Sequence, residues 1–162
     1  NHPETIFICP HMGSRADDLL TAGEDLDRFS NLYYDISARI PILGLGEARA
    51  ETTRDFLITY SDRILFGTDL IYDHTNVPTG MQAQSLYQPR EIPLDGGDPE
   101  EKYVETSCEF IRSHIDFLCS DRLQEAPPFK RSRDGYSIKG VDLPEEVVDE
   151  LLFKNAEKLL RI

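Results

Sequence analysis

Apolar and polar positions in the N-terminal part of the chain fall into two alternating patterns. Short apolar runs that end at turn-forming residues predict buried strands at 5–10, 32–37 and 64–66. Between them, apolar side chains recur at every third or fourth position, which predicts helices at 17–29 and 47–60. Connections of roughly 20–30 residues between successive strands favour parallel pairing. The sequence therefore predicts an α/β fold in which helices cover a parallel sheet.

The pattern changes after the third predicted strand. Residues 73–102 are rich in proline, glycine, aspartate and glutamine and predict a long loop. Residues 103–118 regain the helical period, and 124–140 predict an irregular connection. C-terminal helices are expected over 144–162, where a proline followed by two glutamates suits a first helical turn. Asn155 is predicted to cap the last of these helices.

The charge balance narrows the classes of partner. The chain has 162 residues, the size of one domain, with 17 basic against 30 acidic side chains and a net charge of −13. A surface this acidic repels phosphate backbones and anionic lipid headgroups. No apolar run approaches the ~20 residues that a membrane span needs. We therefore expect neither nucleic acid nor a membrane surface as a partner.

The cysteine count indicates a reducing compartment. Cys108 and Cys119 lie in one predicted helix, where a rise of about 1.5 Å per residue places them roughly 16 Å apart, too far for a disulfide. Cys9 falls in an apolar strand. Three cysteines without paired spacing are typical of reduced, buried thiols, so we expect a cytoplasmic protein.

The predicted strands end in residues that carry chemistry. Parallel sheets place functional groups at the carboxyl ends of their strands, and the three strands lead to His11, Arg39 and Asp69. Alternation along the second strand puts Asp35, Ser37 and Arg39 on one face. Each residue also has a simpler explanation: a hydrogen-bonded turn histidine, an arginine paired with surface carboxylates, and an aspartate that caps a helix. Their shared position at one rim favours a functional site.

His11 and Asp69 are a suitable start for a metal site, because imidazole and carboxylate groups bind zinc and other divalent transition metals. A catalytic zinc needs about three protein ligands. His74 is a more distant candidate for the third, whereas His2 lies at the opposite end of its strand. His114 lies on or next to the apolar face of a predicted helix and is expected to pack there. The predicted ligand set is therefore incomplete.

Four segments of the sequence resemble one known family. Residues 3–13 (PETIFICPHMG) look like the sixth-strand motif of the amidohydrolase-related (amidohydrolase-2) branch of the metal-dependent hydrolases, in which an apolar run leads to His-x-Gly. Residues 32–37 (LYYDIS) resemble its seventh strand, and 62–69 (DRILFGTD) resemble its eighth-strand motif. Residues 151–160 (LLFKNAEKLL) are similar to its closing Asn-Ala helix.

The resemblance implies a (β/α)8 TIM-like barrel, of which this chain would be the C-terminal portion, with strands 6–8 and the following helices. A complete barrel takes roughly 250 residues, so we expect residues 1–162 to be a single partial barrel domain with 73–102 inserted over the barrel mouth. The chain lacks the histidines that the family carries on its first and fifth strands. Three strands would leave two unpaired sheet edges. We expect an N-terminal part of the protein, or a partner chain such as a second copy in a homo-oligomer, to supply the remaining strands.

The resemblance also implies a metal-dependent hydrolase that acts on a small amide, ester or lactone. By the family pattern, Asp69 binds the metal and moves a proton to or from the attacking water. His11 binds a metal or orients the water, and could stabilise the developing oxyanion. Arg39 matches no family role; its charge predicts that it binds a substrate carboxylate. Zinc is the first expectation for the divalent metal, with manganese or iron as alternatives.

Two other functions stay open at this point. Relatives that look like aminocarboxymuconate-semialdehyde decarboxylase release carbon dioxide on the same scaffold without net hydrolysis. A non-catalytic α/β domain that binds a partner through residues 73–102 would explain the missing histidines differently.

Overall fold

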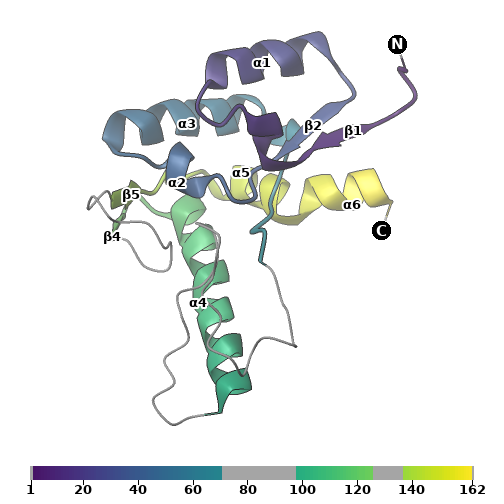
Figure 1. The fold of residues 1–162 in the computed structure, drawn as a ribbon. Coiled ribbons are helices and arrows are strands. Elements are labelled where there is room, and N and C mark those ends of the chain that lie inside the picture. The colour runs from purple at the N-terminus through teal and green to yellow at the C-terminus, as the bar shows by residue number, and fades with distance from the viewer. Residues whose placement is uncertain (1, 71–97, 126–136, 162) are drawn as a thin grey trace.

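The computed structural model describes residues 2–70, 98–125 and 137–161 (Figure 1). Most of the predicted 73–102 loop, with His74, lies outside the described residues, as does the middle of 124–140. The predicted role of that loop as a cover of the barrel mouth therefore stays a prediction.

A three-stranded parallel sheet carries the N-terminal half of the molecule. Its strands are β1 (Phe7–Cys9), β2 (Leu32–Asp35) and β3 (Ile64–Leu65), in the order β1-β2-β3. Cys9 pairs with Tyr34, and Asp35 pairs with Leu65. The predicted parallel α/β arrangement is confirmed for this part of the chain, with strands shorter than the apolar runs that predicted them.

Three α-helices lie between the strands in the chain. They are α1 (Leu19–Arg28), the short α2 (Ile40–Leu43) and α3 (Glu47–Thr59). Asp18 caps α1 by accepting a hydrogen bond from the Thr21 amide at 3.1 Å. Apolar side chains of α1 and α3 join the strand residues in one core, and Figure 1 shows the two helices adjacent to each other.

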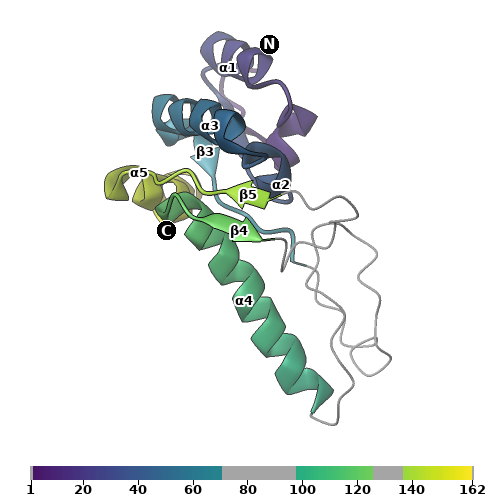
Figure 2. The same cartoon turned by 90° about the vertical axis from the view of Figure 1, so that its left-hand side faces the viewer.

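The helix α4 (Pro99–Cys119) extends away from the sheet in both views (Figure 2). Its C-terminal half belongs to the core, since Phe110, Phe117 and Leu118 are fully buried. His114 is also fully buried in this half, as the sequence predicted. Its Nδ1 lies 2.8 Å from the Phe110 carbonyl oxygen, and its ring contacts the edges or faces of Phe66 and Phe110.

The two ends of the 124–140 segment are not irregular, which corrects the sequence prediction. The strands β4 (Leu123–Glu125) and β5 (Ser137–Lys139) form an antiparallel pair. Tertiary contacts stabilise them: Ile138 is 1% exposed, and the Lys139 amide donates to the Gly44 carbonyl at 2.8 Å. Strands of three residues are too short to show a hydrophobic period, so the sequence pattern does not predict this pair.

The C-terminal helices form one continuous helical segment: α5 (Glu145–Asp149), a π-helical turn at Glu150–Lys154, and α6 (Asn155–Leu160). The prediction that Asn155 caps the last helix is therefore wrong. Asn155 has helical backbone angles and is 1% exposed. Its side-chain amide donates to the carbonyl oxygens of Ser61 at 2.6 Å and Ile64 at 2.8 Å, so it joins the helix to β3.

The two edges of the sheet differ. The Leu65 carbonyl accepts a hydrogen bond from the Ile36 amide, directly after β2, so strand alternation turns the backbone groups of Ile64 and Phe66 outward. The C-terminal helix binds both: Asn155 binds the Ile64 carbonyl, and the Phe66 amide donates to the Leu151 carbonyl at 2.9 Å. The expectation of two unpaired edges is thus wrong for β3. At β1, the sheet of the described residues does end, and Ile8 is 45% exposed there.

The three cysteines are free thiols, and Cys108 and Cys119 both lie in α4, as predicted. Their predicted burial is wrong: Cys9 is half-buried, and the two in α4 are exposed. Among the described residues, we find no helix that is both long enough and apolar enough to span a bilayer.

Candidate functional site

The site begins with an unusual turn directly after β1. His11, Met12 and Gly13 have φ values of 56–57°, and Ser14 follows at 60°, all in the left-handed region. This conformation costs roughly 1–2 kcal/mol for each residue with a side chain. Burial of Met12 in the core offsets part of that cost. Glycine is required at position 13, because a Cβ atom there would lie 2.9 Å from the Tyr34 ring.

Asp35, at the end of β2, holds this turn in place. One oxygen of its carboxylate, Oδ1, accepts the His11 amide at 2.9 Å and the Ser37 amide at 3.0 Å. The Ser37 hydroxyl donates to the same oxygen. Asp35 is half-buried and Ser37 is 7% exposed, so these bonds lie partly shielded from water. These hydrogen bonds therefore compensate for the partial burial of the Asp35 carboxylate.

The His11 ring packs against the same residue pair. Its Nδ1 lies 3.0 Å from the Ser37 carbonyl oxygen and 3.1 Å from the Ser37 hydroxyl oxygen. The structure therefore joins the ends of β1 and β2 through His11, Asp35 and Ser37. The sequence predicted only that His11 and Ser37 lie at one rim, and the structure shows that they are in direct contact.

Arg39 reaches the same cluster from the segment after β2. Its Nε donates to the His11 carbonyl at 3.1 Å, and its Nη1 donates to the Ala38 carbonyl at 3.4 Å. The guanidinium thus supports the backbone of the histidine turn. Its predicted binding of a substrate carboxylate stays a prediction.

Asp69 lies four residues beyond the end of β3, with its backbone in the left-handed region (φ 61°) and its side chain exposed. The same segment meets the cluster at Gly67, where a Cβ atom would lie 3.0 Å from the Ser37 Cβ. Glycine at position 67 thus permits the close approach of the third strand end to the second. The predicted catalytic and metal-binding roles of Asp69 stay predictions.

The donors present fit a metal in kind but not in number. Histidine and aspartate suit a divalent transition metal. Within 2–70, 98–125 and 137–161, however, no three His, Cys, Asp or Glu side chains gather into a group that could hold a metal ion. His11 and Asp69 would therefore need ligands from outside these residues.

Asp35 and Ser37 are members of this cluster that were not among the site residues predicted from the sequence. The signal was present in the alternation Asp35, Ser37, Arg39 along one strand face. The alternation does not show the left-handed turn after β1. This turn brings the His11 amide and ring into contact with Asp35 and Ser37.

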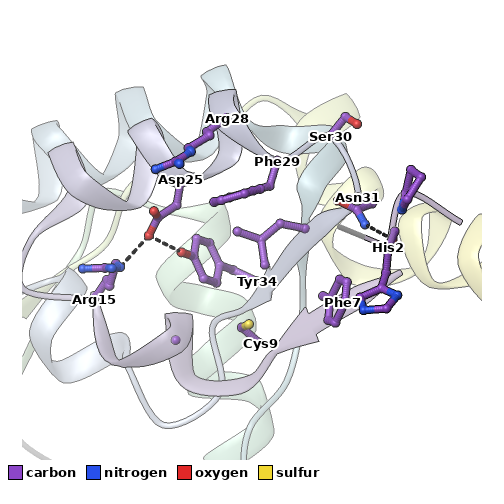
Figure 3. A pocket seen from close by; sticks show the side chains of 13 residues that line it. His2, Phe7, Cys9, Arg15, Asp25, Arg28, Phe29, Ser30, Asn31 and Tyr34 are labelled. Carbon is purple, nitrogen blue, oxygen red and sulfur yellow. Dashed lines mark hydrogen bonds and ion pairs between the residues drawn. The ribbon is translucent and has the colours of Figure 1, made fainter. Parts of the chain in front are cut away.

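A separate cavity of about 750 Å³ lies between α1 and the strands β1 and β2 (Figure 3). Arg15 and Tyr34 both point toward Asp25 there, with an ion pair of 2.6 Å and a hydrogen bond of 3.3 Å. Burial, and then the charge of Asp25, raises the pKa of Tyr34 to about 12. None of the residues that line this cavity is a candidate site residue.

Comparison with known proteins gives one result. A family model described as Amidohydrolase, of the amidohydrolase-2 type, matches residues 1–162. No curated protein matches the chain. No solved structure matches it either.

Proposed function

Because the chain belongs to the amidohydrolase family, we propose that it carries part of the active site of a metal-dependent hydrolase that acts on a small amide, ester or lactone. The observation that supports this most is the cluster of His11, Asp35, Ser37 and Arg39 at the carboxyl ends of β1 and β2. Active sites of parallel α/β folds lie at this end of the sheet.

In this proposal, His11 and Asp69 are two ligands of the metal, and the remaining ligands lie outside the described residues. Zinc is our first choice, with manganese or iron as alternatives. When bound, such an ion lowers the pKa of its water toward about 7 and polarises the scissile carbonyl. Asp69 takes a proton from the attacking water and returns it to the leaving group. Arg39 is positioned beside the histidine turn, where its charge suits a substrate carboxylate.

Replacement of Asp69 tests the catalytic role. In the complete protein, Asp69→Asn keeps the side-chain shape and removes the charge. We expect kcat to fall by about 10²–10⁴-fold, the typical contribution of a positioned general base, with an unchanged thermal midpoint. The matched control is Asp62→Asn, an exposed carboxylate before β3, which should keep full activity. Equal turnover in Asp69→Asn and the wild type would refute the role of Asp69.

Metal content and products test the reaction class. We expect the complete protein to retain stoichiometric zinc, manganese or iron after dialysis, and Asp69→Asn to retain less. Product analysis then separates hydrolysis from decarboxylation, because the latter releases carbon dioxide. A complete protein that keeps no metal would contradict the proposal and favour a non-catalytic binding domain.

A further inference from the structure

The contacts around His11 determine which of its ring nitrogens carries the proton. Nδ1 lies 3.0 Å from the Ser37 carbonyl oxygen. A carbonyl oxygen accepts hydrogen bonds and has none to donate. This contact is therefore a hydrogen bond only if Nδ1 carries the hydrogen.

The second neighbour of Nδ1 is a hydroxyl, which could act in either direction. The Ser37 Oγ lies 3.1 Å from Nδ1, and a hydroxyl has one hydrogen and two lone pairs. If that hydrogen pointed at Nδ1, the histidine would carry its proton on Nε2 instead. Asp35 removes this option, because Ser37 Oγ donates its hydrogen to Asp35 Oδ1. The hydroxyl then turns a lone pair toward Nδ1, and both neighbours are acceptors.

We propose that Asp35 and Ser37 are positioning residues that hold neutral His11 in its Nδ1–H form and leave the lone pair on Nε2. A histidine in this form binds a metal or accepts a hydrogen bond from water through Nε2. It has no hydrogen on Nε2 and so cannot donate from that atom to an oxyanion. Of the roles predicted for His11 from the sequence, metal binding and orientation of the water remain. The inference rests on the proposed function for what Nε2 meets, whereas the proton position is a property of the protein alone.

The first test measures the proton position directly. Two-bond ¹H–¹⁵N spectra of histidine-labelled protein, recorded without metal or substrate at about pH 8, distinguish protonated from unprotonated ring nitrogens above the ordinary histidine pKa of ~6.5. The His11→Gln variant identifies the His11 signals. We expect a protonated Nδ1 and an unprotonated Nε2. The opposite pattern in the wild type would overturn the proposal, even if the Asp35 and Ser37 variants failed to fold.

Three variants test whether Asp35 acts through Ser37. Asp35→Ala leaves the Ser37 hydroxyl free to donate to Nδ1, so we expect the tautomer ratio to move about tenfold toward Nε2–H, which corresponds to about 1.4 kcal/mol. Adding Ser37→Ala removes that hydroxyl and should restore Nδ1–H, because the backbone carbonyl remains. Asp35→Asn keeps an acceptor oxygen and should resemble the wild type. If the double variant does not restore Nδ1–H, the assigned relay is wrong.

Two controls separate local from general effects. His114 also faces a carbonyl oxygen through Nδ1, so its signals should stay unchanged in every variant. The exposed Asp55→Asn on α3 should leave His11 unchanged. Because these spectra need neither metal nor turnover, failure of the hydrolase proposal would leave their outcome intact, and a wrong tautomer would leave the hydrolase proposal standing.

Discussion

The positions of individual residues in this site depend partly on contacts that the strand pattern does not show. Strand ends predicted that His11 and Arg39 would share a rim, and the Arg39–His11 contact of 3.1 Å agrees. Of the three bonds accepted by Asp35, two come from Ser37, two residues along the chain. The third, from the His11 amide, could not be predicted, because it requires four consecutive left-handed residues after β1. Only one of those four residues is the glycine that favours this region. The residue types in this turn therefore do not predict its left-handed conformation.

His114 makes a prediction about acid stability. Burial lowers its pKa from 6.5 to about 4, against the opposing hydrogen bond to Phe110. The folded state thus favours neutral His114, and this stabilisation is complete above pH 6.5 and is lost as the pH falls from 6.5 to 4. A shift of this size is worth about 3 kcal/mol.

Urea unfolding across this pH range measures the effect. His114→Gln removes the titrating group and should flatten the pH dependence of the unfolding free energy between pH 6.5 and 4. His2→Gln, an exposed histidine, is the control and should keep the wild-type slope. A His114→Gln profile parallel to the wild type would show that burial of this ring does not set the acid sensitivity.

Among the elements, the helices with long apolar periods were predictable and the short strands were not. The helix α1 is held by an apolar stripe and an aspartate cap, both of which are local signals. By contrast, β4 and β5 are stabilised by contacts with α2 and its following loop, which no local pattern encodes. The C-terminal helix depends on both local and distant signals. Its apolar period predicted the helix, but the role of Asn155 depends on residues more than ninety positions away.

Asn155 makes a prediction about stability. Asn155→Ala removes two hydrogen bonds to the Ser61 and Ile64 carbonyls and leaves the latter buried without this donor. An unsatisfied buried group costs about 1–3 kcal/mol, so we expect the unfolding free energy to fall by about 2–4 kcal/mol. Denaturant unfolding measures it.

Asn31 provides the matched comparison. Its amide also donates to two backbone carbonyls, those of His2 and Thr5, but in an exposed position where water can replace it. Asn31→Ala should therefore cost less than about 1 kcal/mol. Equal losses in the two variants would argue against burial as the reason for the importance of Asn155.

At the scale of the whole molecule, the parallel sheet and the helices that cover it were predictable from the sequence. Which sheet edge is covered and which is open was not. The family resemblance implied missing strands on both sides. The structure shows that β3 is covered by the C-terminal helix, that Phe7 and Ile8 of β1 are exposed, and that Ile6 directly before β1 is exposed too. We propose that strands from the rest of the protein, or from a partner chain, cover β1.

This proposal predicts that the stability of the 162-residue chain depends on concentration. We expect a marginal melt whose midpoint rises with protein concentration, because association buries the β1 edge. Ile8→Lys places a charge on that edge and should abolish the dependence. Leu20→Lys, at an exposed leucine of α1, is the control. A sharp, concentration-independent melt of the wild-type chain would contradict the proposal.

The C-terminal helix accepts the Phe66 amide at Leu151 and donates to the Ile64 carbonyl from Asn155, and these two hydrogen bonds also limit association through this sheet. A molecule with two open edges can add neighbours without end and form fibres. Within the described residues, one edge of this sheet is already occupied by the chain's own helix. If β1 pairs with a second copy, as proposed, that pairing occupies the open edge of both molecules, and assembly along this sheet ends at two.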